Sequence, residues 1–379
     1  MPSPPGRKRE NTKRALSGPM PLHLALDRVA RAVEAFRRGN SVTITGVGAG
    51  QILAFAVETA SDALLAALKA TERSPALLLL THARARTLKI RLYTPDVVAV
   101  LPELPLRADD LRAIADPTAD LSSPLKGPFD TLRKELPENF AASVKLAKLA
   151  GLLPSTIVRP VKTGTKARAV ISSSEILGYE DAVLQTLRVV TRARVPLEGA
   201  ERTELVAFRA GDGGPEHYAI VIGAPPTGSP VLTRLHSECF TGDLLASLKC
   251  DCGDQLRGAI ETISKAGGGV LLYLAQEGRG IGLINKLRAY RLQDQGFDTI
   301  EANERLGFEA DERLYGVAAR MLGLLGYKSV RLLTNNPDKV AALEAAGVGV
   351  AERVSHAFPD NEHNRAYLRT KAEKAAHLL

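Results

Sequence analysis

Residues 234–255 read RLHSECFTGDLLASLKCDCGDQ and contain all three cysteines of the chain, Cys239, Cys250 and Cys252. Thiolates are soft ligands that favour zinc, and zinc prefers tetrahedral coordination. Structural zinc sites use four protein ligands, whereas catalytic sites use three and leave one position open for water. Three clustered cysteines without a fourth therefore predict an open metal site around which the chain is built. The alternative, three buried cysteines acting as small hydrophobic residues, fits poorly with the aspartates and glycine that flank the Cys-x-Cys pair.

The composition is that of a soluble globular protein with two domains. The 379 residues, 45% of them hydrophobic, are enough for two hydrophobic cores. No apolar run reaches the length of a membrane span. The basic, proline-rich start is not followed by an apolar core, so it is not a secretory signal. Because clustered free cysteines suit a reducing compartment, we expect a cytoplasmic protein.

The net charge of +8 suits an anionic partner, either a nucleic acid or a phosphorylated small molecule. Aromatic residues make up only 4% of the chain and tryptophan is absent, so stacking platforms for single strands are scarce. The composition therefore favours a phosphorylated metabolite, and we expect neither a nucleic-acid nor a membrane partner.

Hydrophobic periodicity predicts an α/β chain. In the second half, strand-like runs such as GGVLLYLA and SVRLLT alternate with helical segments such as LINKLRAYRLQDQG. We therefore predict two domains, each a mixed sheet layered with helices. Residues 1–18 are predicted to be a disordered basic tail, residues 19–195 the first domain and residues 196–379 the second.

Two strand–turn–helix junctions in the second half are candidate anion sites. The first, Gln276–Gly282, directs backbone N–H groups and a helix N-terminus outward, and Arg279 adds a charge suited to phosphate. An ordinary tight turn is an equally good interpretation, because the spacing matches no standard phosphate loop. At the second junction, Thr334 and Lys339 would lie at the carboxyl edge of a sheet, where ligands bind. The two asparagines between them are better explained as helix N-caps.

Three other polar groups look structural when judged from residue patterns alone. Asp311-Glu312-Arg313 is typical of the acidic first turn of a helix, and Tyr290 of a packing residue within one. His236 precedes Cys239 by three residues on a predicted strand, so side-chain alternation would turn it away from a shared metal. We therefore exclude His236 as a fourth ligand.

The second half nevertheless resembles the GTP cyclohydrolase II family, the enzymes that begin riboflavin synthesis. The matching segments follow the family order across nearly all of residues 215–379. They are RLHSECFTGD, SLKCDCGDQL, LLYLAQEGRGIGLINKLRAYRLQDQGFDT, EANERLGF, ADER, RLLTNNPDK and TKAEKAAHLL. The resemblance implies a C-terminal domain of the GTP cyclohydrolase II type, with zinc bound by Cys239, Cys250 and Cys252.

The same resemblance implies roles for residues that the patterns alone leave structural. It implies that Tyr290, Asp311 and Arg313 are catalytic. The nucleotide-binding residues that it implies are Arg234, Leu235, His236, Ser237, Glu238, Gln255, Glu277, Gly278, Arg279, Thr299, Thr334 and Lys339.

The implied reaction is zinc-dependent hydrolysis of GTP, which opens the imidazole ring and releases formate and pyrophosphate. The product would be 2,5-diamino-6-(5-phosphoribosylamino)pyrimidin-4-one. The resemblance also implies one zinc ion per chain, Mg²⁺ with the triphosphate, and a homodimer. Because three thiolates make zinc a weaker acid, it would need a neighbouring base or hydrogen-bond partner, for which Asp311 and Tyr290 are the candidates. Arg313 would stabilise transition-state charge.

Two alternative functions stay open. A cyclohydrolase variant could retain the formyl group, but the presence of Tyr290 counts against it. A non-catalytic GTP-sensing regulator could keep the fold without turnover. The intact Asp311, Arg313 and cysteine set count against that regulator, since a non-catalytic relic is free to lose them.

The first half, over residues 22–161, resembles a 3,4-dihydroxy-2-butanone 4-phosphate synthase domain. The similarity rests on LDRVARAVEAFRRGNSVTI and AASVKLAKLAGLLPSTIVRPV. The residues that carry the synthase chemistry do not follow. The acidic magnesium loop is replaced by Gly46–Gly50, the His-Thr-Glu triplet by Asn139-Phe140-Ala141, and a later glutamate by Pro160. We therefore expect a degenerate, non-catalytic domain that serves in dimerisation or supports the sheet edge near Glu201.

That sheet edge is where the second half departs from its family. The Leu-Pro-Thr and Gly-x-Phe pattern of the first strand pair is missing from residues 200–223, AERTELVAFRAGDGGPEHYAIVIG. We expect a shortened edge there and unchanged site residues.

Overall fold

The computed structural model describes residues 21–359 except 48–49, 70–74, 104, 106, 163 and 166, together with residues 362 and 364. The predicted tail over 1–18 and the terminal segment TKAEKAAHLL lie outside the described residues. In the part that is described, none of the helices combines the length and apolar character that a bilayer crossing requires.

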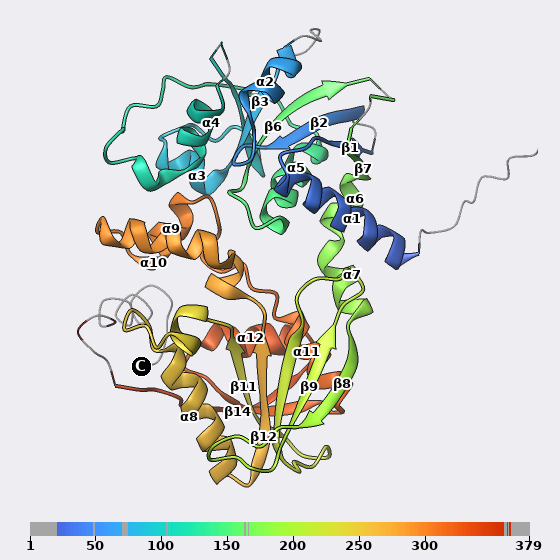
Figure 1. Cartoon of the computed structure of the whole chain (residues 1–379), viewed down its shortest axis with the longest axis vertical. Helices are drawn as coiled ribbons and strands as arrows, with labels where there is room; N and C mark the ends of the chain where they lie inside the picture. The colour runs from blue at the N-terminus through green and yellow to red at the C-terminus, as the bar shows by residue number, and fades with distance from the viewer. Residues whose placement is uncertain are drawn as a thin grey trace, which may run out of the picture.

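The chain forms two layered halves stacked end to end and connected through α7 (Tyr179–Thr186), as Figure 1 shows. Each half contains a seven-stranded mixed sheet covered by helices. The predicted α/β class with two mixed sheets is therefore confirmed.

The first sheet has the strand order β5-β4-β3-β6-β2-β1-β7. Its strands are β1 (Val42–Gly46), β2 (Gly50–Ala56), β3 (Leu77–Thr81), β4 (Val97–Leu101), β5 (Asp130–Thr131), β6 (Ser155–Val161) and β7 (Ala169–Ser172). β1 pairs parallel with β7, and the remaining described pairs are antiparallel. The β3 sequence LLLLT is buried along its whole length because helices cover both faces of the sheet.

The helices of this half form two cores with the sheet. They are α1 (Leu22–Arg37), α2 (Asp62–Lys69), α3 (His82–Thr87), α4 (Ala108–Ala115), η1 (Pro117–Ala119), α5 (Glu138–Leu149), α6 (Ser173–Leu177) and α7. On one face, α1 and α5 contribute Phe36 and Leu146 to a core with the strands. The core on the other face also contains Ile281 and Phe308 from the second half of the chain.

The second sheet has the strand order β14-β13-β11-β12-β10-β9-β8. Its strands are β8 (Arg188–Arg194), β9 (Thr203–Arg209), β10 (His217–Gly223), β11 (Val231–Ser237), β12 (Gly268–Leu274), β13 (Ser329–Leu333) and β14 (Gly349–Val354). β11 to β14 are parallel, whereas β8, β9 and β10 extend the sheet antiparallel. The carboxyl ends of β11, β12 and β13 therefore meet at one edge, where ligands bind in open α/β sheets.

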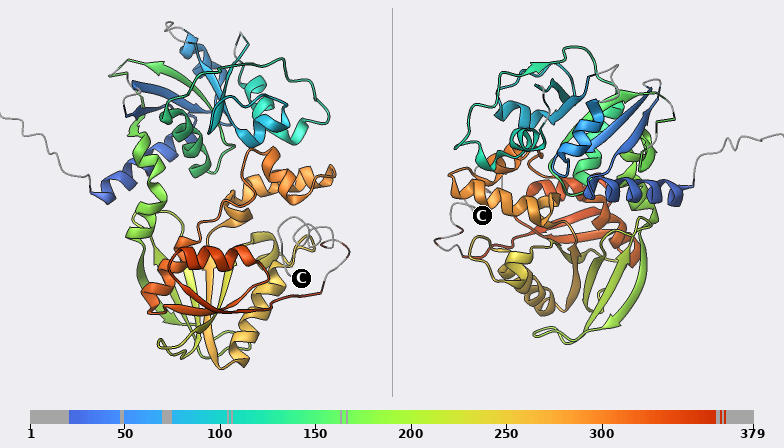
Figure 2. Two further views of the ribbon diagram at one scale, coloured as in Figure 1. Left: turned by 180° about the vertical axis from the view of Figure 1, so that it is seen from behind. Right: turned by 45° about the horizontal axis from the view of Figure 1, so that its top comes forward.

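Two helices of the second half leave its sheet. The helices are η2 (Phe240–Leu244, a π-helical turn), α8 (Cys252–Lys265), η3 (Glu277–Gly280), α9 (Gly282–Asp294), α10 (Thr299–Arg305), α11 (Gly316–Leu325) and α12 (Pro337–Ala345). α11 and α12 cover one face of the sheet and α8 the other. α9 and α10 lie instead between the two sheets, beneath the first half (Figures 1 and 2).

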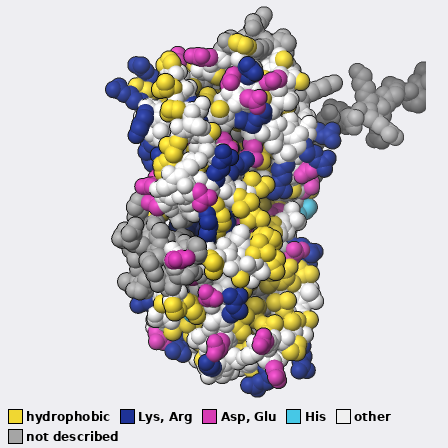
Figure 3. Space-filling model, turned by 60° about the vertical axis from the view of Figure 1, so that its left-hand side comes forward, with side chains coloured by type: hydrophobic (Ala, Val, Ile, Leu, Met, Phe, Trp, Pro, Cys, Tyr) yellow, Lys and Arg dark blue, Asp and Glu magenta, His cyan; other side chains and the backbone are white. Residues whose placement is uncertain are grey.

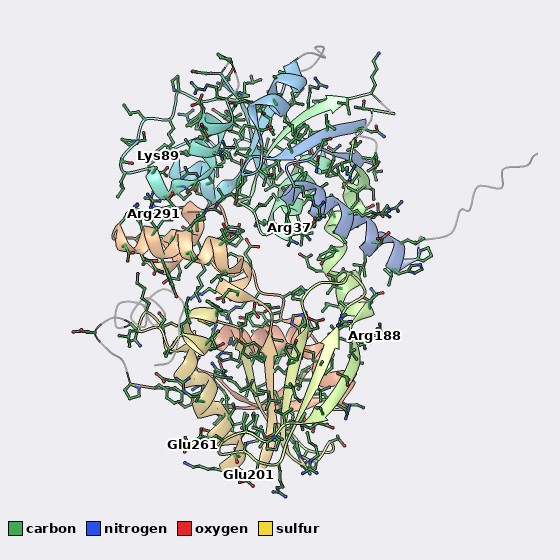
Figure 4. The ribbon with its side chains drawn as sticks, viewed as in Figure 1. Arg37, Lys89, Arg188, Glu201, Glu261 and Arg291 are labelled. Atoms are coloured by element: carbon green, nitrogen blue, oxygen red, sulfur yellow. The ribbon has the colours of Figure 1, made fainter. Side chains whose placement is uncertain are left out.

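Several boundary predictions are corrected by the structure. β8 pairs with β9, so a boundary before residue 196 would remove the edge strand of the second sheet, and the sheets divide between α7 and β8. In the segment 200–223, where a shortened edge was expected, β9 pairs along its length with β10 and β8, so β8 and not this segment forms the edge of the sheet. Asp311-Glu312-Arg313 does not open a helix, since α11 begins at Gly316. Glu201 lies at the end of the molecule remote from the first sheet, so the first half does not support that edge (Figure 4).

Candidate active site

The three cysteines meet where β11 ends and α8 begins. Their sulphur atoms all lie within 4.8 Å of one another, and the Sγ atoms of Cys239 and Cys250 are 3.8 Å apart. Two thiolates at about 2.3 Å from a tetrahedral zinc ion lie roughly 3.8 Å from each other. The spacing and the soft donor set therefore fit zinc.

Because Gly242 has no side chain, the three sulphur atoms have space to converge. A Cβ atom at Gly242 would lie 2.8 Å from the sulphur of Cys250 and 3.0 Å from that of Cys239. The Gly242 N–H instead donates to the Cys239 sulphur at 3.2 Å. The TGD turn after Cys239 thus forms part of the cradle, and only glycine fits there.

The charges of the three thiols depend on one another. The pKa of Cys239 is lowered by hydrogen bonds from Cys250 and Cys252, and further by Lys286. The hydrogen bond to Cys239 raises the pKa of Cys250 to about 11. The pKa of Cys252 is also raised, by its hydrogen bonds to the other two sulphur atoms and by burial. Protein groups therefore stabilise one thiolate, and three thiolates together need a cation.

Lys286 is a residue of the candidate site that the sequence does not predict. Its Nζ donates to the Cys239 sulphur at 3.0 Å, to Thr241 Oγ1 at 3.0 Å and to Glu277 Oε1 at 2.8 Å. Burial alone would lower the pKa of Lys286, but the bonds to Cys239 and Glu277 outweigh it and raise the pKa. One signal was available: Lys286 precedes Tyr290 by four residues, which places both on one face of a helix.

Tyr290 lies beside this lysine and not in a hydrophobic core. Its hydroxyl is 3.3 Å from Thr241 Oγ1, and the Lys286 ammonium lies 5.7 Å from the centre of its ring. Burial raises the pKa of Tyr290 to about 12, so the hydroxyl keeps its proton at neutral pH. The interpretation of Tyr290 as a packing residue is therefore wrong.

One cavity brings most of the predicted site residues together. The predicted residues that line it are Arg234, His236, Ser237, Glu238, Cys239, Cys250, Cys252, Gln255, Glu277, Gly278, Arg279, Tyr290, Thr299, Arg313, Thr334 and Lys339. The lining also includes Lys249, Lys286, Gln293, Asn303 and His356. Its charged residues are mostly basic, with Glu238 and Glu277 as the carboxylates, so the cavity suits an anionic ligand.

Two predicted residues do not line this cavity. The side chain of Leu235 is buried in the core of the second sheet, and only its carbonyl oxygen reaches the site, where it accepts from Lys339 at 3.1 Å. Asp311 lies behind Arg313, whose Nε donates to Asp311 Oδ1 at 2.8 Å. Burial raises the pKa of Asp311, but the bonds and charge of Arg313 outweigh burial and lower it. Asp311 is therefore placed to orient Arg313.

Arg234 and His236 project from β11 into the cavity. The Arg234 guanidinium donates to the Leu333 carbonyl at 2.9 Å and to Gln255, and burial lowers the pKa of Arg234 to about 10. His236 Nε2 lies 3.0 Å from Asp243 Oδ1. His236 is not among the clustered sulphur ligands, as expected. The reason is not side-chain alternation along a strand, because β11 ends before Cys239 and both residues line the same cavity.

The QEGRGIG loop is a built structure and not an ordinary turn. Gly278 and Arg279 both adopt left-handed backbone angles, with φ of 63° and 62°. Glu277 accepts from the Phe240 N–H at 2.6 Å and from Lys286, so this carboxylate ties the loop to the cysteine segment. Arg279 donates to the Ala310 carbonyl at 3.1 Å and lines the cavity.

The loop after β13 contributes Thr334, Asn335 and Asn336 to the cavity lining, and the two asparagines also hold the backbone. Thr334 and Lys339 both line the cavity. The predicted N-cap role is confirmed for Asn336, whose side chain accepts from the Asp338 N–H at 2.9 Å. Asn335 exchanges two hydrogen bonds with the backbone of His356 instead. Thr299 lies in the first turn of α10, and its hydroxyl accepts a hydrogen bond from Gln293.

Known proteins match both the second half alone and nearly the whole chain. The family model described as GTP cyclohydrolase II matches residues 188–355. A GTP cyclohydrolase-2 of Azospirillum brasilense is 50% identical over 365 residues, which cover 94% of each chain. A GTP cyclohydrolase-2 of Azotobacter vinelandii is 60% identical over 166 residues, 44% of this chain and 80% of its own.

Two further matches extend into the first half or across the chain. The riboflavin biosynthesis protein RibBA of Bacillus mycoides is 46% identical over 252 residues, 63% of this chain and 64% of its own. A crystal structure of a two-domain 3,4-dihydroxy-2-butanone 4-phosphate synthase from A. baumannii covers 87% of this chain at 17% identity. Its TM-score of 0.34 is too low to bear on the fold or the activity.

Proposed function

Because the chain belongs to the GTP cyclohydrolase II family, the hydrolases of riboflavin biosynthesis, we propose that it acts through one zinc ion held by Cys239, Cys250 and Cys252. GTP would be converted to 2,5-diamino-6-(5-phosphoribosylamino)pyrimidin-4-one, formate and pyrophosphate. The observation that carries the proposal is a three-sulphur cluster lining the same basic cavity as Tyr290 and Arg313. When bound, zinc supplies a Lewis acid that lowers the pKa of a water molecule for attack on C8.

The groups around the sulphur cluster would hold protons and charge during ring opening. The Lys286 ammonium offsets part of the negative charge of the thiolates through its contact with Cys239. Tyr290 keeps its proton, so it is placed to donate a hydrogen bond to a developing negative charge on the guanine ring. This assignment makes Tyr290 a donor and not a base.

The basic side chains farther along the cavity would bind the triphosphate. Arg313 is held by Asp311 through two nitrogen atoms, which directs its guanidinium and leaves its charge available to a phosphate. An arginine stays charged, so we assign Arg313 to stabilising the transition state of phosphate-bond cleavage. Mg²⁺ would arrive with the triphosphate, since the cavity offers it few carboxylates.

A homodimer is the proposed assembly, and an exposed apolar patch supports it. Six large apolar side chains that are 45–71% exposed lie in two neighbouring segments, the turn after Cys239 and one face of α9. They are Phe240, Leu244, Leu245, Leu248, Ile284 and Leu287. Figure 3 shows that hydrophobic side chains also gather on the surface of the second half, from the junction of the halves downward. Patches of this kind mark protein interfaces.

We also propose a cytoplasmic location, because cysteines that form no disulfide suit a reducing compartment.

The first half is proposed to be non-catalytic. Asn139 stands where the synthase family has a histidine, and its amide is turned to the carbonyl oxygens of Ile44 and Gly50 at 3.4 and 3.5 Å. Pro160 lies within the β2–β6 ladder and carries no acid or base. Neither residue supplies a carboxylate for a magnesium ion or a base that could remove a proton next to a carbonyl.

The test is to incubate purified protein with GTP and Mg²⁺ and to measure formate, pyrophosphate and zinc. We expect one zinc per chain and equal amounts of formate and pyrophosphate. Cys250→Ser should lose the zinc and the ring opening, because a hydroxyl is a far poorer zinc ligand than a thiolate. Pyrophosphate without formate would identify the formyl-retaining variant. Protein that binds GTP but releases neither product would instead be a regulator.

A further inference from the structure

The helix that carries Tyr290 has two working faces. One face of α9 directs Lys286, Tyr290 and Gln293 into the cavity. The opposite face meets the first half, where Asn285 donates to the Gly151 carbonyl at 3.1 Å. α9 therefore touches both the site and the non-catalytic half, and Figure 2 shows it lying between the two sheets.

A carboxylate of the first half holds this second face. The Arg288 guanidinium donates to Glu58 Oε1 at 2.8 Å and to Oε2 at 3.2 Å, and it lies 3.5 Å from Asp116. Glu58 is fixed in turn by the Leu153 N–H, which donates to it at 2.8 Å. The side chains of Arg288 and Glu58 are 19% and 17% exposed, so water screens this pair weakly.

A second ion pair reaches the loop that carries Asp311 and Arg313. Lys148, near the end of α5, donates to Glu312 Oε1 at 2.6 Å. The same Glu312 oxygen accepts from the Glu309 N–H at 2.8 Å. Glu312 therefore holds the loop together and also binds it to the first half. Glu312 thus lies between Asp311 and Arg313 in the sequence, and its side chain is directed to the first half.

Apolar packing joins the same surfaces. Side chains of α9, α10 and the chain before Asp311 are buried in one core with strands of the first half. From the second half the core includes Ile281, Ala289, Leu292, Ala302, Leu306 and Phe308. Burial of this kind contributes most of the contact energy, while the two ion pairs fix its register.

We propose that the first half is a clamp that positions the catalytic elements of the second, with Glu58 and Lys148 as positioning residues. Glu58 sets the rotation of α9, and so the place of Tyr290, through Arg288. Lys148 sets the Asp311–Arg313 loop through Glu312. The proposal rests on the proposed function, because it assigns these two contacts to the turnover of GTP.

The experiment compares full-length Lys148→Met and Glu58→Gln with Lys145→Met. Lys145 lies one turn earlier on α5 and pairs with Glu180 inside the first half, so it is a matched control. We expect Lys148→Met and Glu58→Gln to lower kcat roughly tenfold or more, since small misplacements of catalytic groups are costly. KM for GTP, zinc content and melting temperature should stay close to those of Lys145→Met. The charge-reversed pair Lys148→Glu with Glu312→Lys should recover most of the turnover lost by Lys148→Glu alone.

A second readout does not depend on turnover. Hydrogen–deuterium exchange should rise over residues 283–294 in Glu58→Gln and over residues 309–313 in Lys148→Met, and in neither segment of Lys145→Met. Wild-type protein without GTP turnover would contradict the proposed function while leaving this exchange test of the clamp intact. Variants that match Lys145→Met in both kcat and exchange would overturn the clamp. So would losses of zinc and melting temperature in proportion to kcat, because they indicate a purely structural role.

Discussion

At the scale of single residues, the sequence reveals the three cysteines of the candidate metal site and misses what surrounds them. The three cysteines stand out because their spacing and chemistry are visible in one short stretch. Lys286 comes 34 residues after Cys252 in the sequence, and nothing local shows that its Nζ reaches the Cys239 sulphur. Asp311 was one of two candidates for a base or hydrogen-bond partner, but its bonds to Arg313 become visible only when the loop is folded.

Arg313 and Asp311 are predicted to differ in how their removal lowers turnover. Arg313→Ala removes the charge itself, and we expect kcat to fall roughly a hundredfold or more with zinc unchanged. Asp311→Asn keeps a hydrogen-bond acceptor for Arg313, so its loss should be smaller. Because the pKa of Asp311 is lowered, the carboxylate stays ionised below its ordinary pKa, and the wild-type pair is lost only as the pH falls through that lowered pKa. Steady-state kinetics with GTP will check this, and an Asp311→Asn defect larger than that of Arg313→Ala would show that Asp311 is itself the base.

His356 is predicted to make the protein less stable in mild acid. Burial lowers the pKa of His356 from 6.5 to about 4. Between pH 6.5 and pH 4 the unfolded chain binds a proton at this histidine and the folded chain does not. The free energy of unfolding is therefore unaffected by this group above pH 6.5 and falls as the pH drops towards 4. His356→Gln should reduce the stability lost between pH 7 and pH 5 by about 2 kcal/mol at most. Urea unfolding at both pH values measures it, with the exposed His23→Gln as the control; equal pH dependence in all three proteins would refute it.

At the scale of elements, regular periodicity was readable and loop geometry was not. The alternation of buried strands and helices in the second half predicts its α/β layers. The QEGRGIG loop could not be told from a tight turn, since two consecutive left-handed residues leave no clear mark in the sequence. Asp311-Glu312-Arg313 carried a helix-start pattern, but this loop is held instead by Arg279, Lys148 and its own backbone.

Gly280 is predicted to set the distance between the QEGRGIG loop and the Asp311 loop. Its φ is 93°, and a Cβ atom there would lie 2.7 Å from the Glu312 carbonyl oxygen. Gly282 has a similar φ of 83° but open space around it, so Gly282→Ala is a matched control for backbone strain alone. We expect Gly282→Ala to cost about 1–2 kcal/mol in stability. Gly280→Ala should cost clearly more and lower kcat, and denaturant unfolding with GTP kinetics will compare them; identical losses would mean that the two loops can move apart freely.

At the scale of the whole molecule, the sequence predicts two α/β halves but not how they meet. The sequence LINKLRAYRLQDQG predicts a helix, but it cannot show that Ala289 and Leu292 pack under another sheet while Ile284 and Leu287 stay exposed. The shared core of α9, α10 and the first half depends on contacts between residues more than 200 positions apart, such as Glu58 with Arg288. The expected support of the sheet edge near Glu201 failed for this reason, since the first half lies at the opposite end of the second sheet.

The last prediction is that the full-length protein makes no dihydroxybutanone phosphate from ribulose 5-phosphate and Mg²⁺. Removing a proton next to a carbonyl needs a base, and the resulting enediolate needs a metal ion. Asn139 is fully buried with its amide turned to backbone carbonyls, and Ala141 and Pro160 offer no titratable group. Product analysis at high enzyme concentration, with a functional synthase as the positive control, will check it. Turnover that Asn139→Ala abolishes, with GTP turnover unchanged, would show that the first half has kept its own chemistry and is more than a clamp.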